Sequence, residues 1–278
     1  MQDCVRIIGR VVNLSTEDSN LGPDCIGLFN LGDENSSSKY RVKLNLHEVT
    51  QYSVFEGEVI VAEGFNDANS KFNVNRLHKL AVRPPQSLCN FAELQRFNQL
   101  QQQKPIQCMV AAGPFTTKSD LLYDGLQELM SRVRQENPHV LILMGPFVDG
   151  MNEDVGSGNI SFRQSSGQIE FLEFEDLFSK VMEYIKSEID QNRVKTKVVI
   201  VPSAREIHHI HPLPQPAYEA SLFPAGFEPV LIGNPQMFRI NDINVGLLNA
   251  DVVKDLCAAT HNRAIQGGKI EECVKSVL

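Results

Sequence analysis

The stretch V-L-I-L-M-G-P-F-V-D, residues 140–149, is an apolar run that ends in a glycine-proline loop. Two further runs have the same character: residues 106–113 lead into A-A-G-P-F, and residues 197–201 lead into P-S-A-R-E. Short continuous apolar runs are typical of strands in a parallel sheet, which are buried on both faces. The three runs therefore predict parallel strands, and α/β folds place their functional residues in the loops at the carboxyl ends of such strands.

Helical periodicity separates these strands. Residues 120–135 and 173–190 both carry apolar side chains at helical spacing, and this predicts two amphipathic helices. Residues 150–171, rich in Gly, Ser and Asn, are expected to form a long surface loop. Three more elements are expected further on, namely strands at 230–233 and 243–248 and a helix that starts within 250–256. The alternation predicts a layered α/β domain over residues 106–278.

Residues 1–83 have a different pattern, in which short alternating stretches are separated by Gly, Asn and Asp. Strands are expected at 5–12, 25–29, 40–46, 57–64 and 71–82. A helical pause is expected over residues 46–52, before the fourth strand. Five short strands with such a pause predict an oligonucleotide/oligosaccharide-binding (OB) barrel.

Residues 84–105 are expected to link the two domains. The linker opens with Pro84-Pro85, and residues 90–101 have apolar side chains on one helical face: Phe91, Leu94, Phe97 and Leu100. Helical apolar spacing most often marks packing, so this helix is interpreted as one that packs one domain on the other.

Composition excludes several classes of protein. The chain has 278 residues and a net charge of −8, with no apolar run of the roughly 20 residues that span a bilayer. Its N-terminus lacks the basic start and apolar stretch of a secretory signal, so an intracellular protein without a membrane contact is expected. The six cysteines include no C-x-x-C pair, which argues against a zinc ribbon or a disulfide framework.

Charge also bears on nucleic acid binding by the barrel. Residues 1–83 contain 9 Lys and Arg against 11 Asp and Glu, a net charge of −2. The aromatic residues of this region are expected mostly at core positions: Phe29, Tyr40, Tyr52, Phe55, Phe65 and Phe72. Binding of a single strand needs clustered cations beside stacking aromatics, so a contact with protein is favoured over a contact with DNA.

The loops that follow the three apolar runs resemble the frame of metal-dependent phosphoesterases of the calcineurin-like fold, which carry D-x-H, G-D-x-x-D and G-N-H-[DE] there. Most ligand positions hold residues that cannot bind a cation: Ala111, Ala112, Gly113, Pro146, Ser203 and Ala204. Asp149 remains at the position of the second acid. A site for two metal ions needs several converging carboxylates and imidazoles, and one Asp cannot hold two metals. No catalytic, metal-binding or cofactor-binding residue is therefore assigned.

Other polar residues have structural interpretations. The cluster His208-His209-x-His211 is interpreted as structural or surface-exposed, because adjacent residues on an extended segment point to opposite sides. Asp149 beside a glycine suits a residue that hydrogen-bonds its own loop. Arg205, next to Glu206 and near Asp149, is predicted to form an internal ion pair, with the guanidinium in place of a metal cation.

Taken together, the motifs resemble the B subunits of DNA polymerase alpha. The resemblance rests on Y-S-V-F-E-G-E-V-I-V-A-E-G-F-N at 52–66, V-A-A-G-P-F-T-T at 110–117, L-M-G-P-F-V-D at 143–149, V-P-S-A-R-E-I-H-H at 201–209 and P-L-P-Q-P at 212–216. The small subunits of polymerases delta and epsilon share the layout, but the P-S-x-R-[DE]-x-H-H form followed by P-Q-P is most similar to alpha.

The resemblance implies a non-catalytic accessory subunit of the polymerase alpha–primase complex, which acts in the initiation of DNA replication in the nucleus. It implies an inactive phosphoesterase-like domain without cofactors. The implied partners are the C-terminal domain of the catalytic subunit and, through the complex, primase, with DNA contact indirect or weak. Such subunits usually have a helical domain and a tether before the barrel and further strands after the last helix, so the phosphoesterase-like domain is expected to be truncated at its C-terminus, in a fragment or an aberrant gene product.

Two alternatives remain open from the residues. The first is an OB-type module that binds single-stranded DNA. The second is an active metallophosphoesterase with a shifted ligand set of Asp149, His208, His209 and Asp251.

Overall fold

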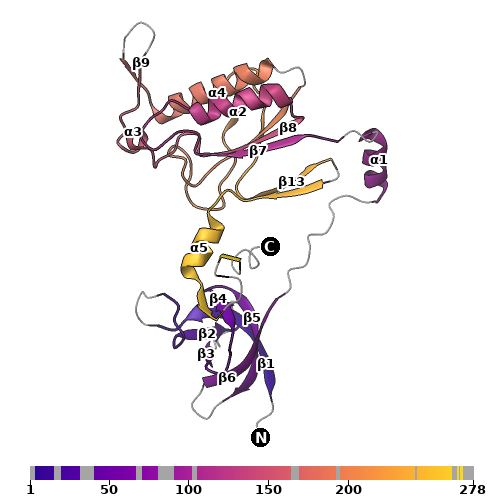
Figure 1. The fold of residues 1–278 in the computed structure, drawn as a ribbon, viewed down its shortest axis with the longest axis vertical. Helices are drawn as coiled ribbons and strands as arrows, with labels where there is room; N and C mark the ends of the chain where they lie inside the picture. Colours follow the sequence, from indigo (N-terminus) through magenta and orange to yellow (C-terminus); the bar gives the residue numbers. More distant parts are fainter. Residues whose placement is uncertain are drawn as a thin grey trace. The chain divides into compact units, whose positions relative to one another are not determined.

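The chain forms two compact units in the computed structural model (Figure 1). The structure describes residues 4–15, 20–31, 41–66, 71–80, 91–101, 105–163, 169–191, 195–241, 243–264, 268 and 270–271. The first unit combines Met1–Pro85 with Asp251–Leu278, and the second spans Gln86–Ala250. This division differs from the expected domains 1–83, 84–105 and 106–278, because the last residues cluster with the barrel and the linker helix clusters with the α/β unit. No helix among the described residues is long and apolar enough to cross a membrane.

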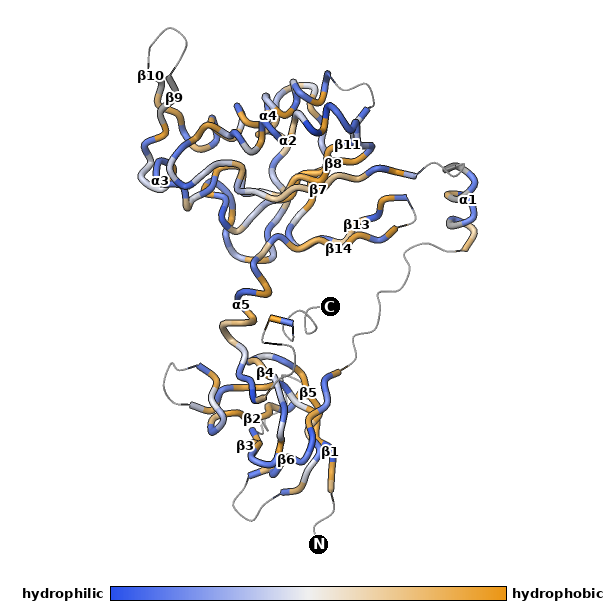
Figure 2. The backbone as a smooth tube through the Cα atoms, in the orientation of Figure 1, coloured by the Kyte–Doolittle hydropathy of each residue, from blue (hydrophilic) through white to orange (hydrophobic). Residues whose placement is uncertain are grey.

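The first unit is built on a closed five-stranded barrel in the order β1-β2-β3-β6-β5. Its strands are β1 (Val5–Asn13), β2 (Ile26–Phe29), β3 (Arg41–Asn45), β5 (Val59–Asn66) and β6 (Lys71–Lys79). Neighbours pair antiparallel except β3 and β6, which are parallel. Inward and outward side chains alternate along these strands, apart from a register shift at Glu63 and Gly64 in β5, and Figure 2 shows hydrophobic and hydrophilic residues side by side along the barrel.

The aromatic residues of the barrel divide between core and surface. Tyr52 and Phe72 are buried in the barrel core, as expected. Phe29, Phe55 and Phe65 are only half-buried, so most of the described aromatic residues lie outside the core and the expectation is wrong on this point. The sixth aromatic residue, at position 40, lies outside the described residues.

The expected helical pause is wrong. Residues 46–51 form turns and bends, and the short strand β4 (Tyr52–Val54) follows. β4 pairs antiparallel with β15 (His261–Arg263) from the far end of the chain. Arg263 reinforces this pairing, because its Nη1 lies 3.0 to 3.3 Å from the carbonyl oxygens of Leu46, His47 and Val49. Hydrogen-bond partners for the backbone of residues 46–54 therefore come from the distant strand β15 and from the side chain of Arg263. The helix α5 (Val252–Ala259) precedes β15, close to the expected position.

The second unit has a parallel sheet in the order β12-β11-β8-β7. Its strands are β7 (Cys108–Ala112), β8 (Val140–Met144), β11 (Lys197–Val201) and β12 (Val230–Leu231). Both predicted central strands are confirmed: β11 coincides with the run 197–201, and β8 covers the first five residues of the stretch 140–149. They are the two central strands of the sheet, and burial on both faces explains their unbroken apolar sequence.

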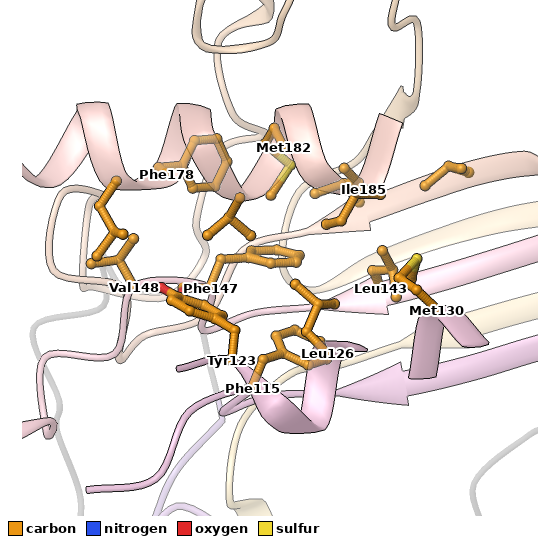
Figure 3. Packing of buried hydrophobic residues seen from close by; sticks show 14 of the residues in the cluster. Phe115, Tyr123, Leu126, Met130, Leu143, Phe147, Val148, Phe178, Met182 and Ile185 are labelled. Carbon is orange, nitrogen blue, oxygen red and sulfur yellow. The ribbon is translucent and has the colours of Figure 1, made fainter. Parts of the chain in front are cut away.

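Two helices cover one face of this sheet, α2 (Asp124–Glu136) and α4 (Phe174–Asp190) (Figure 1). Their apolar stripes and the inward side chains of β8 and β11 form the main core (Figure 3). Helix α2 begins four residues later than expected because Asp120 stabilises a turn, where it accepts a hydrogen bond from the backbone N–H of Leu122 at 3.1 Å. Helix α4 begins where predicted, with a capping box between Glu173 and Asp176.

A hairpin packs on the other face of the sheet. It consists of β13 (Gln236–Ile240), which the sequence analysis missed, and β14 (Ile243–Leu247). Phe238, Ile240 and Leu247 contact the buried side chains of the central strands. The unit is therefore layered as helices, sheet and hairpin. Helix α1 (Phe91–Gln101) contacts the hairpin through Arg239, whose guanidinium lies 5.7 Å from the ring centroid of Phe97.

The long loop expected at 150–171 contains structure of its own. It holds the short helix α3 (Glu153–Gly156) and the strand pair β9 (Ser161–Arg163) and β10 (Ile169–Phe171). Asn152 caps α3 by accepting hydrogen bonds from two backbone N–H groups, and Val155 is buried in the main core. A short 3-10 helix, Ala220–Leu222, packs against α4.

Candidate functional site

Three loops meet at the carboxyl end of the parallel sheet, residues 113–115, 145–149 and 202–206, and we call them the loop cluster. The ladder of the sheet continues into them, because Gly113 N–H bonds the carbonyl of Met144 at 2.8 Å and Gly145 N–H bonds that of Val201 at 2.9 Å. Phe147 and Val148 turn back into the main core, where Phe147 stacks on Phe115 (Figure 3). The loops are thus anchored by both hydrogen bonds and core packing.

Neighbouring loops leave no room for a side chain at two positions of the cluster, because a backbone oxygen lies too close to one and a carboxylate oxygen too close to the other. A Cβ atom on Gly113 would lie 2.3 Å from the carbonyl oxygen of Pro146, and one on Gly145 would lie 2.6 Å from Glu206 Oε2. Position 113 is the one that the sequence analysis matched to the histidine of a D-x-H motif. No histidine fits there without moving the neighbouring loop.

Glu206 is the central polar residue of the cluster, and the sequence analysis assigned it no role. Its side chain is fully buried and accepts hydrogen bonds from the backbone N–H groups of Phe147 at 2.9 Å and Val148 at 2.5 Å. The hydroxyl of Tyr218 donates a third hydrogen bond to Oε2 at 2.6 Å. The carboxylate therefore serves as an acceptor for loop 145–149 and joins it to the segment around Tyr218.

Burial dominates the protonation equilibrium of Glu206. It raises the pKa to about 7, while the hydrogen bonds from Tyr218, Phe147 and Val148 oppose the rise and the nearby Asp149 charge adds to it. Burial and the Glu206 charge also raise the pKa of Tyr218 well above its usual value, which keeps the hydroxyl protonated as a donor.

Arg205 forms the internal ion pair predicted from the sequence, and the structure gives Asp149 as its partner. Arg205 Nε lies 3.1 Å from Asp149 Oδ1, and its Nη2 donates a second hydrogen bond to Oδ2. Asp149 is buried and also accepts the backbone N–H of Met151 at 3.1 Å, so it hydrogen-bonds its own loop as expected. The bidentate pair joins the second loop to the third and uses both carboxylate oxygens.

His208 lies deeper than its neighbours in sequence. Its side chain is 1% exposed, its ring centroid is 4.7 Å from that of Phe178, and neither ring nitrogen has a hydrogen-bond partner among the described residues. Burial lowers the pKa of His208 to about 4, and the charge of Glu175 only partly opposes this. The ring is therefore neutral near pH 7 and packs as an aromatic side chain.

A network of side-chain amides holds two loops of the cluster through their carbonyl groups. Asn234 is fully buried and donates from Nδ2 to Gln215 Oε1 and to the carbonyl of Asn249, both at 2.9 Å. Asn249 in turn donates to the carbonyls of Gly145 at 3.0 Å and Pro202 at 2.9 Å. The network satisfies loop carbonyls that have no strand partner.

The shifted metal set does not assemble. Asp149 is ion-paired with Arg205, and the buried ring of His208 stacks on that of Tyr218. His209 Nε2 lies 2.9 Å from the carbonyl oxygen of Pro216. Asp251 precedes α5 and belongs to the other compact unit. Within the described ranges, no three His, Cys, Asp or Glu side chains converge as metal ligands would. The residues present do not fit a binuclear metal centre.

His211 completes the histidine cluster. Its Nδ1 lies 3.0 Å from the carbonyl oxygen of Ala204, so it contacts the third loop through backbone. Like His209, it is thus placed by a carbonyl of its own segment.

Comparison with known proteins agrees with the layout of the chain. The family of B subunits of DNA polymerases alpha and epsilon matches residues 108–278, more than half of the chain. The chain belongs to this family of polymerase B subunits. Residues 1–80 match the OB domain of the B subunit of DNA polymerase alpha, so the closed barrel is an OB domain.

Individual B subunits are similar over most of the chain. The B subunit of DNA polymerase alpha from Bos taurus is 30% identical, over 80% of this chain and 34% of that protein. The one from Saccharomyces cerevisiae is 29% identical over 96% of this chain and 37% of its own length. The one from Rattus norvegicus is 27% identical, over 82% and 36%. The chain spans about a third of the length of these relatives.

Proposed function

We propose that this chain acts as part of a non-catalytic accessory subunit of the DNA polymerase alpha–primase complex. In this role it holds the C-terminal domain of the catalytic subunit, and through it contacts primase, during initiation of DNA replication in the nucleus. The names of its relatives support this proposal, because each is the B subunit of DNA polymerase alpha.

We further propose that the α/β unit is a phosphoesterase-like frame without activity. The observation that carries this is the loop cluster itself, where the polar side chains are committed to internal partners. Glu206 binds two backbone N–H groups and Tyr218, and Asp149 binds Arg205. A fixed guanidinium beside the carboxylate supplies the positive charge that a metal ion would otherwise provide.

A capture experiment tests the accessory role. The full chain is mixed with the C-terminal domains of the alpha, delta and epsilon catalytic subunits, each immobilised at equal density. We expect selective capture by the alpha domain. No capture by any of the three, with a chain shown to be folded by its melting transition, would contradict the proposal.

An activity assay tests the inactive frame separately. Hydrolysis of bis-p-nitrophenyl phosphate is followed with added Mn²⁺, for the wild-type chain and the Asp149→Asn variant. We expect both to match the rate without protein. Turnover by the wild type that the substitution abolishes would show a working metal site.

A further inference from the structure

Charge is distributed unevenly in the OB domain, which the net charge conceals: Glu63 of β5 is the one acidic residue within the five barrel strands. Strands β1, β2, β3 and β6 contain no Asp or Glu. They carry seven cations: Arg6, Arg10, Arg41, Lys43, Lys71, Arg76 and Lys79. The small negative sum over residues 1–83 therefore does not describe the outer surface of these strands.

Strand register brings four of these cations together. The inward row is Val11, Leu28 and Val42, whose side chains belong to the barrel core. Because side chains alternate along a strand, the adjacent row of Arg10, Phe29 and Arg41 points outward. Neighbouring strands lie about 4.8 Å apart, so Arg10 and Arg41 are roughly 10 Å apart with Phe29 between them.

A second outward row lies two residues further along β3. There Lys43 pairs in register with Lys71 of the parallel strand β6. Like charges in register repel each other and destabilise a sheet. We call Arg10, Phe29, Arg41, Lys43 and Lys71 the cationic strip.

The cations of the strip have no ion-pair partner among the residues that the structure describes. Arg6 is bound to Glu63 at 2.7 Å and Lys79 to Glu58 at 3.5 Å, so these two outlying cations are paired. Arg10, Arg41, Lys43 and Lys71 have no ion pair with any described residue. The positive charge of the strip is open to an external anion.

We propose that the cationic strip binds single-stranded nucleic acid, with a base on the half-buried ring of Phe29 and phosphates on the four cations. Cations that follow a backbone beside an aromatic ring are the combination used by sequence-tolerant single-strand sites. Phe29 favours this ligand over an acidic peptide, because a base offers a flat face for the ring between Arg10 and Arg41 and a carboxylate does not. The proposal is independent of the accessory role, which capture by the catalytic subunit tests separately.

The test is fluorescence anisotropy of a labelled 20-nucleotide oligothymidylate with the full chain at 50 and 200 mM NaCl. Four phosphate contacts predict a slope of log affinity against log salt of about −2.8, or roughly 50-fold weaker binding at the higher salt. Each single substitution, such as Arg41→Ala or Lys43→Ala, is expected to reduce the slope by about 0.7. The variant R10A/R41A/K43A/K71A is expected to lose the salt-dependent binding.

Stacking is tested by Phe29→Ala, which is expected to weaken binding roughly 5- to 150-fold without a change in slope. Phe29→Tyr keeps the ring and is expected to keep the affinity. The matched control for charge is Arg132→Ala, which removes an exposed cation of the second unit and is expected to change neither affinity nor slope. Each variant is first shown to melt within a few degrees of the wild type.

Three results would overturn the proposal. One is the absence of saturable binding by the folded wild-type chain at 50 mM NaCl. Another is binding by the four-cation variant as tight as that of the wild type. The third is displacement of the oligonucleotide by an oligoglutamate peptide together with unchanged binding by Phe29→Ala, which would assign the strip to an acidic protein segment.

Discussion

The loop cluster and the cationic strip treat charge in opposite ways. In the loop cluster, Asp149 and Glu206 are buried and each is satisfied by groups from the neighbouring loops. In the cationic strip, four cations lie on adjacent strands without a carboxylate partner among the described residues. Internally satisfied charge serves the fold, whereas unpaired charge of one sign on a regular surface is available to a ligand.

Substitution of Glu206 gives the largest expected effect and tests whether buried charge in the loop cluster stabilises the fold. Glu206→Ala would leave two buried backbone N–H groups and the Tyr218 hydroxyl without an acceptor. Each unsatisfied buried group costs roughly 1 to 3 kcal/mol, so we expect a loss of about 3 to 5 kcal/mol in the free energy of unfolding. Urea denaturation measures this.

Glu206→Gln is the matched control, because it keeps the shape and one acceptor oxygen. We expect it to cost about 1 to 2 kcal/mol. If Ala and Gln substitutions cost the same and less than 1 kcal/mol, Glu206 does not hold the loops together.

The pH dependence of stability gives the next largest effect. Glu206 has its folded pKa raised to about 7 from 4.5, so its contribution is full below pH 4.5 and is lost as the pH rises to 7. His208 has its folded pKa lowered to about 4 from 6.5, so its contribution is full above pH 6.5 and is lost as the pH falls to 4. The two slopes oppose each other between about pH 4.5 and 6.5.

Glu206→Gln removes the pH dependence that Glu206 contributes and leaves that of His208. Between pH 6.5 and 4 we therefore expect the free energy of unfolding of the variant to fall by roughly 3 kcal/mol more than that of the wild type. One titrating group changes this free energy by up to about 1.4 kcal/mol per pH unit. Urea midpoints across this range provide the measurement. Parallel curves for the two proteins would contradict the assigned shifts.

Gly145→Ala tests the close packing of the loops. The new Cβ would lie 2.6 Å from Glu206 Oε2, and we expect a cost of about 1 to 3 kcal/mol in thermal or urea unfolding. Gly125→Ala makes the same chemical change in helix α2, where the nearest atom is 3.5 Å from the new Cβ. This control should be neutral or stabilise by up to about 1 kcal/mol, and a reversed order of the two variants would refute the packing argument.

Arg205→Ala should have the smallest effect of the set. Its side chain is 40% exposed, so solvent screens the ion pair with Asp149, and we expect about 1 kcal/mol. A double-mutant cycle with Asp149→Asn isolates the coupling of the pair. A coupling energy of zero would show that the pair does not join the loops.

Much of the second unit could be predicted from local sequence. The central strands β8 and β11 were found because their apolar sequences are uninterrupted, and helix α4 because its apolar side chains keep helical spacing over 17 residues. Strand β13 was missed because Q-M-F-R-I packs only one face on the sheet and gives a weak signal. The same difference in burial explains why central elements are easier to recognise than surface hairpins.

The candidate site could be predicted only where its residues belong to recognisable motifs at the ends of neighbouring strands. An internal ion pair of Arg205 followed from the meeting of two strand-end loops, and the structure shows that its partner is Asp149. The role of Glu206 was not found because its partner Tyr218 lies on an irregular segment 12 residues away, whose path no periodicity predicts. The β4–β15 pairing joins residues over 200 positions apart, and local pattern contains no information on such a contact.

Thermal melting of the full chain with and without Mn²⁺ tests most directly whether the loop cluster is structural. A metal that binds the folded state raises the melting temperature with its concentration. Our account predicts no saturable shift, in the wild type or in Asp149→Asn. A saturable rise in the wild type that Asp149→Asn abolishes would show that the cluster holds a metal, and would contradict the account.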